Sequence, residues 1–324
     1  MPKNEKRYYV DILLSTYNGG LYLDELLNSL LEQTHKDWRL IVRDDGSSDN
    51  TVKIVKDFSA GHPDRVILLG GDGRRLGACR SFIKLLEASE ADYVMFCDQD
   101  DVWLPDKIDI TLKAMQETES KHGDIPILVH TDLKVVDQEK NLISESFWRY
   151  QHLDPHLKGL NTLLVLNNVT GCTMMINGRL AKLVASVPEG AILHDWWIAL
   201  VATAFGRVEY VSAPTMLYRQ HGKNEAGAVS YSLSYFSSRV RNLGASMDLA
   251  RRIVEQGKAF LLIYGDRISK ADREIVYNFS TLFQQWKIKR LFTLLRFRLK
   301  TYGFLRNLGI STLFLLLSDK VSQD

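Results

Sequence analysis

Apolar and polar residues alternate along the first hundred positions in a pattern that predicts strands separated by helices. Short runs of β-branched and large aliphatic residues, each followed by a polar turn, are typical of buried strands. Between them, apolar residues recur at the spacing of one helical face, most clearly from Leu21 to Thr34. The predicted strands are residues 9–14, 38–42, 66–69 and 92–97, and the predicted helices are residues 21–34, a helix capped by Ser48 or Asp49, and residues 81–88.

Strands joined by helices of this length form a parallel sheet with right-handed crossovers, so the pattern indicates the α/β class. The second half of the chain predicts further elements of both kinds. We expect a helix that begins within residues 102–107, another at 196–205, and strands at 127–130, 163–176 and 215–218, the second of which contains a turn.

Polar residues follow three of the predicted strands at the point where each strand ends. These segments are Ser15 to Asn18, Asp44 to Asp49 and Asp98 to Asp101. The carboxyl ends of parallel strands open on one edge of a sheet, and ligands bind outside that edge. The three segments should therefore converge on one site.

The site is organised around three carboxylates, those of Asp98, Asp100 and Asp101. Like charges a few ångströms apart repel one another, and burial adds a desolvation penalty, so such a cluster favours a divalent cation between its members. The alternative is a solvated turn between a strand and a helix, with Asp101 or its neighbour as the helix N-cap.

The composition is that of an ordinary globular protein, with 324 residues of which 45% are hydrophobic and 25% charged. Cys79, Cys97 and Cys172 are odd in number and far apart, so they support neither a disulfide framework nor a zinc site. A reducing cytoplasm fits this pattern. The first seven residues are polar and run straight into a strand, and we expect no secretory signal.

The small net charge of +2 hides a basic segment near the end of the chain. Residues Gln284 to Arg306 carry seven bases and no acid, interleaved with large apolar residues. The apolar run Ile310 to Leu317 that follows is too short to span a bilayer. Such a segment suits the surface of an anionic membrane. The alternatives are helices packed on the main domain with their bases in water, and a homodimer contact.

Several motifs resemble those of the inverting nucleotide-sugar glycosyltransferases with the GT-A fold, of the family 2 type. The resemblance covers about Val10 to Asn224, and within the family the chain is most similar to bacterial rhamnosyltransferases of cell-wall or capsular polysaccharide synthesis. The motifs are Ser-Thr-Tyr-Asn at 15–18, Arg-Asp-Asp-Gly-Ser-Ser-Asp at 43–49, Asp-Gln-Asp-Asp-Val-Trp-Leu-Pro-Asp-Lys at 98–107, His-Thr-Asp at 130–132, Asn-Val-Thr-Gly-Cys-Thr-Met-Met at 168–175, His-Asp-Trp-Trp at 194–197 and Tyr-Arg-Gln-His at 218–221.

The resemblance implies a Rossmann-like, mostly parallel central sheet with helices on both faces. It also implies a GT-A catalytic domain at residues 1–225, with a nucleotide-binding half at 1–101 and an acceptor-binding half at 102–225. A basic and apolar helical extension at residues 226–324 would follow, close to the membrane or in an oligomer contact.

On the donor side, the resemblance implies that Asp45 hydrogen-bonds the nucleotide base. An ionised carboxylate only accepts hydrogen bonds, so Asp45 would select the ring N–H of uracil or thymine. The alternative is that Asp44 and Asp45 only open the turn at Gly46. Arg80 could approach the base or a phosphate, and the alternative is an ordinary surface arginine. The other residues implied in nucleotide-sugar binding are Ser15, Thr16, Tyr17, Arg80, Asp98 and Gln99.

The resemblance also implies a Mg²⁺ or Mn²⁺ ion held by Asp100, with Asp101 as an additional candidate ligand. His221 would close over the metal or the diphosphate. Hard cations favour oxygen ligands, whereas imidazole suits Mn²⁺ better than Mg²⁺. The alternative for His221 is an ordinary loop histidine that makes a hydrogen bond.

Asp195 is the implied catalytic base. An inverting transfer is a single displacement, in which an acceptor hydroxyl attacks the anomeric carbon while a positioned carboxylate takes its proton. The family places its base at the motif that contains Asp195. Because Asp195 precedes an apolar helix, the alternative is an N-cap, and the two roles are compatible.

We therefore expect a metal-dependent inverting glycosyltransferase that moves L-rhamnose from dTDP-L-rhamnose to a hydroxyl of a polyprenyl-diphosphate-linked glycan. Such a protein would be cytoplasmic, peripherally associated with the inner face of the cell membrane, and without a nucleic-acid partner. One alternative keeps the fold but uses a UDP-hexose donor, for glucosyl, galactosyl or N-acetylglucosaminyl transfer. Another is a catalytically silent scaffold, which should have lost Asp100 or Asp195, and both are present.

Overall fold

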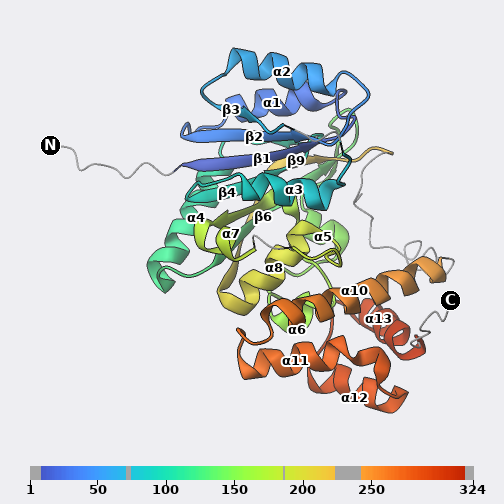
Figure 1. The fold of residues 1–324 in the computed structure, drawn as a ribbon. Helices are drawn as coiled ribbons and strands as arrows, with labels where there is room; N and C mark the ends of the chain where they lie inside the picture. Colours follow the sequence, from blue (N-terminus) through green and yellow to red (C-terminus); the bar gives the residue numbers. More distant parts are fainter. Residues whose placement is uncertain (1–8, 71–73, 185–186, 223–241, 318–324) are drawn as a thin grey trace.

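One mixed sheet runs through the first two thirds of the chain (Figure 1). The computed structural model describes residues 9–70, 74–184, 187–222 and 242–317. The expected domain boundary between residues 225 and 226 lies outside these ranges. The strands are β1 (Val10–Thr16), β2 (Trp38–Asp44), β3 (Val66–Leu68), β4 (Tyr93–Cys97), β5 (Val102–Trp103), β6 (Ile127–Val136), β7 (Leu142–Ser144), β8 (Met174–Asn177) and β9 (Arg207–Arg219).

In the described part of the chain, nine strands pair in the order β3-β2-β1-β4-β8-β6-β9-β5, with β7 paired to β6. The first four of these are parallel. Their register places Thr16 opposite Asp44 and Leu14 opposite Cys97, so β1, β2 and β4 end at the same edge. Beyond β4, the strand β8 is antiparallel to both of its neighbours, while β6 and β9 are parallel. The predicted α/β class is confirmed.

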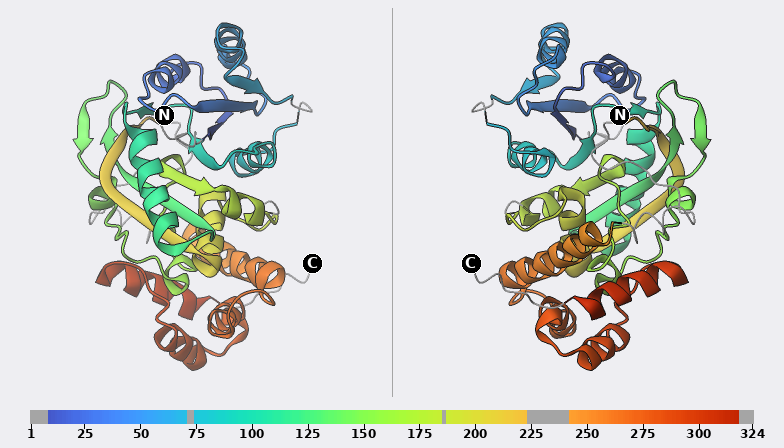
Figure 2. Two further views of the ribbon diagram at one scale, coloured as in Figure 1. Left: turned by 90° about the vertical axis from the view of Figure 1, so that its left-hand side faces the viewer. Right: turned by 90° about the vertical axis from the view of Figure 1, so that its right-hand side faces the viewer.

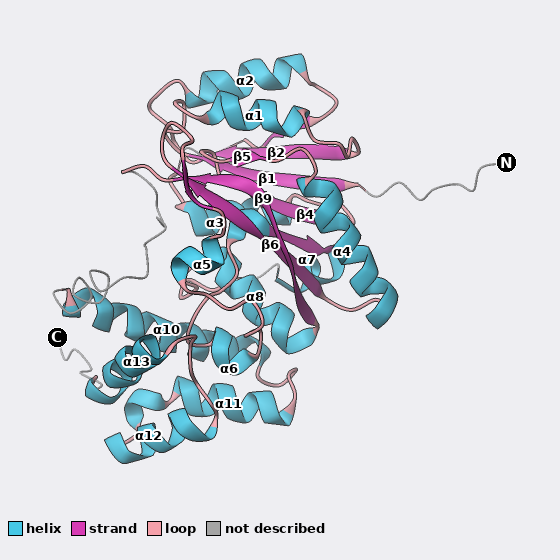
Figure 3. Ribbon diagram, turned by 180° about the vertical axis from the view of Figure 1, so that it is seen from behind, coloured by secondary structure: helices cyan, strands magenta, loops and turns pink. Residues whose placement is uncertain are grey.

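Helices cover both faces of the sheet (Figure 3). They lie mainly between strands in the first part of the chain and follow one another in the last part. The helices are α1 (Leu23–Leu31), α2 (Thr51–Gly61), α3 (Ala78–Glu87), α4 (Lys107–His122), α5 (Phe147–Gln151), α6 (Leu160–Leu163), α7 (Gly178–Val184), α8 (His194–Phe205), α10 (Leu243–Tyr264), α11 (Lys270–Ser280), α12 (Lys287–Arg296) and α13 (Phe304–Leu316), with short 3-10 helices at Gly171–Thr173 and Leu282–Gln284.

Alternate residues of the central strands feed two different cores, because successive side chains of a strand point to opposite faces. Ile12 and Leu14 pack with apolar residues of α1, α2 and α4 on one face. Leu13 and Phe96 pack on the other face with residues of α3, α7 and α8. The central strands are therefore buried on both sides, which explains why they read as continuous apolar runs.

The C-terminal helices α10 to α13 form a layer beyond α8, on the side away from α1 and α2 (Figures 1 and 2). The rings of Phe260 and Tyr264 in α10 lie 5.7 and 6.1 Å from the ring of Trp197 in α8. The second core thus continues from the sheet into these helices. No helix within the described ranges is long and apolar enough to cross a bilayer.

Three predicted elements differ from the structure. Residues 102–103 form the short strand β5, and α4 begins only at Lys107, with Ile108, Leu112 and Met115 buried. Asp101 is therefore not an N-cap, and Asp106 holds that position. The predicted strand 163–176 was wrong over most of its length, and the one at 215–218 is the end of the much longer β9. The segment 163–176 comprises the end of α6, a loop, a 3-10 helix and the start of β8.

The error at 163–176 has a physical cause. A short buried apolar run such as Leu163 to Val165 does not distinguish a strand from a buried helix turn. The loop that follows is held by the side chain of Asn168, which donates to the backbone oxygens of Asp154 and Leu157. These partners lie outside the segment, so its local pattern does not reveal them.

Candidate active site

A cavity of about 1830 Å³ opens at the edge where β1, β2 and β4 end. This volume exceeds the roughly 300–1,000 Å³ of an ordinary small-molecule pocket, so there is room for two substrates. The described wall includes neither Arg80 nor Asp101. Of the predicted site residues, it contains Ser15, Thr16, Tyr17, Asp45, Asp98, Gln99, Asp100, Asp195 and His221.

Asp44 and Asp45, although adjacent, have different partners. The Oδ2 atom of Asp44 accepts hydrogen bonds from the backbone N–H groups of Gly46 and Ser47 at 3.0 and 2.8 Å. Its Oδ1 atom accepts the Thr16 hydroxyl at 2.8 Å. Asp44 alone therefore opens the turn at Gly46, where the backbone φ of +89° suits glycine.

Asp45 is buried and faces the cavity. Its Oδ1 atom accepts from the Arg43 guanidinium at 2.6 Å and from the N–H of Leu76, and its Oδ2 atom accepts from the N–H of Gly77 at 2.8 Å. Burial alone would raise the pKa of Asp45, but the hydrogen bonds from Arg43 and two backbone N–H groups outweigh it and lower the pKa. The carboxylate is thus held ionised, with a free lone pair on Oδ2 for a further donor.

Tyr17 is fixed by Gln99, which follows the neighbouring strand. The backbone N–H of Tyr17 donates to Gln99 Oε1 at 2.8 Å, and Gln99 Nε2 donates to the Tyr17 carbonyl at 2.9 Å. The guanidinium of Arg75 lies 3.9 Å from the centre of the Tyr17 ring. This cation–π pair forms one wall of the cavity.

Arg75 was missed by the sequence analysis. The adjacent bases Arg74 and Arg75, placed between a strand and a helix, were the available signal. Arg80, which the resemblance implied instead, is more than half exposed and pairs with Glu189 at 2.6 Å. The structure does not bring Arg80 to the cavity.

Asp100 and His221 meet at the cavity wall. Asp100 Oδ2 and His221 Nε2 are 2.7 Å apart, and both side chains are largely buried. This contact is a hydrogen bond or ion pair between the imidazole and the carboxylate, as in the alternative given for His221, and it places two groups that can bind a divalent cation side by side. The mixed oxygen and nitrogen donors suit Mn²⁺ better than Mg²⁺.

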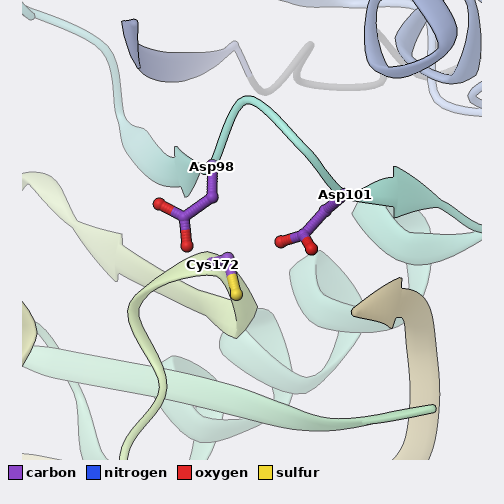
Figure 4. A group of neighbouring side chains, drawn as sticks. All are labelled: Asp98, Asp101 and Cys172. Carbon is purple, nitrogen blue, oxygen red and sulfur yellow. The ribbon is translucent and has the colours of Figure 1, made fainter. Parts of the chain in front are cut away.

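The carboxyl groups of Asp98 and Asp101 point toward the thiol of a third residue, Cys172 (Figure 4). Their ligand atoms and the thiol lie within 4.8 Å of one another. Burial, followed by the charges of Asp100 and Asp98, raises the pKa of Asp101 well above its usual range. Burial also raises the pKa of Cys172 well above its usual range. A bound cation would displace these protons, because metal ligands bind in their deprotonated form, so these side chains are candidate ligands alongside Asp100 and His221.

Asp195 is the second residue of α8 and lies at the cavity wall. Leu193 holds the N-cap position, so the N-cap alternative for Asp195 was wrong. Its Oδ1 atom accepts from Trp196 N–H and from Asn167 Nδ2, and Oδ2 accepts from Gly171 N–H. Burial raises the pKa of Asp195 more than these hydrogen bonds lower it, and the resulting pKa is about 6. A carboxylate of this kind is ionised at neutral pH and more basic than usual.

His194, the first residue of α8, packs against aromatic side chains next to Asp195. Its ring stacks on that of Phe82 at 4.2 Å between centroids and lies 5.2 Å from the ring of Phe96. Burial lowers the pKa of His194 to about 3, so the ring is neutral. The sequence analysis assigned it no role, although it stands beside Asp195 in the quoted motif.

Comparison with known proteins places these residues in a family context. Residues 11–177 match the family model described as glycosyl transferase family 2. A dTDP-rhamnosyl transferase of Shigella flexneri, RfbG, is 28% identical over 234 residues, which cover 68% of this chain and 76% of that protein.

Two solved structures share the fold at low sequence identity. Residues 1–349 of TarS from S. aureus, in complex with UDP-GlcNAc, superpose with a TM-score of 0.55 at 18% identity, covering 89% of this chain and 80% of that one. The mannosyltransferase PcManGT from Pyrobaculum calidifontis, in complex with GDP-Man and Mn²⁺, gives 0.54 at 15% identity, covering 95% and 80%. The arrangement is the GT-A fold with an added C-terminal helical region.

Proposed function

Since the chain belongs to glycosyl transferase family 2, we propose that it is a metal-dependent inverting rhamnosyltransferase. It transfers L-rhamnose from dTDP-L-rhamnose to a hydroxyl of a lipid-linked glycan in bacterial cell-surface polysaccharide synthesis. The observation that carries the proposal is that Asp195, a carboxylate with a raised pKa, lines the same cavity as Asp45 and Asp100. One cavity thus contains a candidate base, a candidate nucleotide reader and a candidate metal ligand.

Asp195 takes the proton of the attacking hydroxyl in this proposal. The N–H of Gly171 fixes Oδ2 at 3.0 Å and leaves it a lone pair for the acceptor. A general base works best with a pKa near the operating pH, which the buried carboxyl of Asp195 approaches. Proton transfer to Asp195 also relieves its buried charge as the new glycosidic bond forms.

On the donor side, Asp45 reads the base through the open lone pair of Oδ2, and Tyr17 flanks it with its ring. Arg43 and the backbone hold Asp45 ionised, which excludes a base that presents only a lone pair there. Asp98, which also lines the cavity, would contact the ribose or the sugar. A cation bound by Asp100 and His221 would neutralise charge on the leaving diphosphate.

The rhamnose donor is supported by the similarity to a dTDP-rhamnosyl transferase over 68% of this chain. A UDP-hexose donor is the second candidate, and the fold shared with a protein that binds UDP-GlcNAc favours it. Uracil and thymine present the same ring N–H to a carboxylate, so Asp45 is compatible with both.

In this proposal, residues 1–101 form the half of the catalytic domain that binds the donor, and residues 102–225 form the half that binds the acceptor. The acceptor is a polyprenyl-diphosphate-linked glycan at the inner face of the cell membrane. The C-terminal region, residues 226–324, lies close to that membrane. The size of the cavity supports two substrates, because it exceeds what one nucleotide-sugar needs.

A donor panel tests the proposal. Nucleotide release is measured with dTDP-L-rhamnose, UDP-glucose, UDP-galactose and UDP-N-acetylglucosamine, with and without Mn²⁺. We expect turnover of dTDP-L-rhamnose that requires the metal and disappears in Asp195→Asn. Turnover of a UDP-hexose alone would replace the donor assignment, and no turnover of any donor would favour the silent scaffold.

A further inference from the structure

Helix α12 turns its apolar side toward solvent. The side chains of Ile288, Phe292 and Leu295 are 67%, 61% and 69% exposed, and those of Leu291 and Trp286 are exposed as well. Positions 288, 291, 292 and 295 fall on one side of a helix, because residues three and four apart are neighbours. The apolar face of a helix in a globular protein normally packs against the core. We call this outward row, Trp286, Ile288, Leu291, Phe292 and Leu295, the α12 face.

The orientation of α12 is fixed by a buried arginine. Arg290, on the inner side of the helix, is 5% exposed and donates to four backbone carbonyl groups. An arginine has five N–H donors and cannot be buried without partners, so it holds the polar side of α12 inward. The four acceptors are the oxygens of Phe283, Gln285, Phe314 and Leu317.

Bases flank the α12 face, and the nearest acids in the sequence are distant. The chain contains neither Asp nor Glu between Glu274 and Asp319. Of the bases in this segment, Arg290 and Arg306 are buried, and Arg296 pairs with Glu274 at 3.0 Å. The other exposed bases beside the face are Lys287, Lys289, Arg298 and Lys300.

We propose that the α12 face is a membrane-docking surface that inserts into the headgroup region of an anionic bilayer. A short helix with Trp, Phe and Leu on one side and lysines beside them is suited to this position. Each lysine near an anionic surface strengthens binding about fivefold. The segment between Glu274 and Asp319 carries no acid to oppose this attraction, and Glu274 is already paired with Arg296.

Docking would also bring the bilayer close to the catalytic cavity. Helix α13 packs against α12, and its residues Ile310, Leu313 and Phe314 line the cavity that contains Asp195. On its exposed side, α13 adds Phe304, which is 80% exposed, and Leu308. This part of the inference rests on the proposed function, since it gives a lipid-linked acceptor a short path from the bilayer to the base.

Vesicle flotation of the full-length protein tests the inference. Vesicles of phosphatidylcholine alone are compared with vesicles of phosphatidylcholine and phosphatidylglycerol. We expect binding to the anionic vesicles, a loss of at least tenfold in Phe292→Glu/Leu295→Glu, and a loss of about 30-fold in Lys287→Gln/Lys289→Gln. Leu142→Glu, at an exposed leucine of β7 that pairs with the sheet, is the matched control and should bind like the unchanged protein.

The lysine variant keeps the test valid should the doubly acidic variant be unstable, because both lysines are exposed. Sedimentation of the same proteins identifies the competing occupant, a second copy of the chain. A dimer that the acidic variant dissociates, with no vesicle binding by the unchanged protein, overturns the inference. Binding to anionic vesicles that neither double variant weakens also overturns it.

Nucleotide release without vesicles separates this inference from the proposed function. Variants that release nucleotide like the unchanged protein but no longer float support the docking surface. Flotation that depends on the α12 face in a protein that uses no donor would leave the docking surface standing and remove the proposed function.

Discussion

The backbone N–H of Gly171 donates to the carboxylate of Asp195, with 3.0 Å between the nitrogen and Oδ2. A Cβ atom on Gly171 would lie 3.0 Å from His194 Nε2 and 3.4 Å from Asp195 Cβ. The candidate base is therefore positioned by a turn of the chain where an added Cβ atom would fit only if the side chains of His194 and Asp195 shifted by a few tenths of an ångström.

Gly171→Ala should displace the Asp195 carboxyl and lower kcat on the order of 10- to 100-fold, since small misplacements of a catalytic group have such effects. The KM for the donor should stay nearly constant, because the donor residues come from other strands. Steady-state kinetics checks this, with Gly61→Ala as the control, where an added Cβ meets nothing within 4 Å. An unchanged kcat would show that the turn tolerates a methyl group.

Asp195→Asn should lower kcat by about 10²- to 10⁴-fold, because the amide no longer accepts the proton of the attacking hydroxyl. In the unchanged enzyme, kcat should fall on the acid side of a pH near 6, where Asp195 becomes protonated. Steady-state kinetics of the variant and the pH profile of kcat in the unchanged enzyme check these two expectations. A variant with normal turnover, or an acid limb that persists unchanged in the variant, would assign the base to another residue.

Asp195→Asn should also stabilise the fold at neutral pH. The pKa of Asp195 is raised from 3.8 to about 6, so its contribution to stability is complete below about pH 4 and is lost as the pH rises through 6. At pH 7 the ionised carboxylate costs up to about 3 kcal/mol. The amide avoids this cost but turns its NH2 group toward one of the donors to Asp195, so the net gain is smaller. Urea unfolding at pH 4 and pH 7 checks this, and the gain should appear only at the higher pH. Equal gains at both pH values would point to packing instead of charge.

His221→Gln should weaken nucleotide binding about tenfold in Mn²⁺ and less in Mg²⁺, because imidazole is a better ligand for Mn²⁺. Its Nε2 atom lies 2.7 Å from Oδ2 of Asp100, the predicted metal ligand. Titration of the nucleoside diphosphate in each metal measures the effect. His122→Gln, at an exposed histidine near the end of α4, serves as the control. The same loss in the two metals and in a chelator would assign His221 a structural role.

The sequence was sufficient for the parts of the fold that depend on local pattern. The apolar runs of β1 and β2 and the leucine face of α1 all lie where periodicity placed them. The sequence also predicted that Asp45 and Asp98 meet at one cavity. Each residue follows a parallel strand, and these strands end at the same edge of the sheet.

What the sequence did not reveal depends on contacts between distant segments. Cys172 meets Asp101 because a loop after α6 folds under β4, and Arg75 covers Tyr17 from a loop that follows another strand. The orientation of α12 is set by Arg290, whose acceptors include the carbonyl group of Phe314 in α13. Hydrophobic periodicity alone would have placed the apolar side of α12 inward.

The pair of hydrogen bonds between Gln99 and the backbone of Tyr17 leads to the last prediction. These bonds, at 2.8 and 2.9 Å, tie the residue after β1 to the residue after Asp98. An alanine at position 99 would release Tyr17 from this tie, while Asp45 and Asp195 would keep their own partners. We expect Gln99→Ala to raise the KM for the donor about tenfold, which corresponds to two lost hydrogen bonds at the lower end of their usual strength, with kcat nearly unchanged.

Gln99→Glu distinguishes the hydrogen bonds of the Gln99 amide from the space that its side chain fills. Glutamate keeps the oxygen that accepts from the Tyr17 N–H but places a second, negatively charged oxygen against the Tyr17 carbonyl oxygen. Two acceptors at this distance repel each other, so its KM should be at least as high as that of the alanine variant. Gln284→Ala, at an exposed glutamine in the C-terminal region, is the control. A residue that only positions Tyr17 should change donor binding and leave the proton transfer at Asp195 unchanged. A fall in kcat with a constant KM in Gln99→Ala would therefore show that Gln99 acts on the reaction itself.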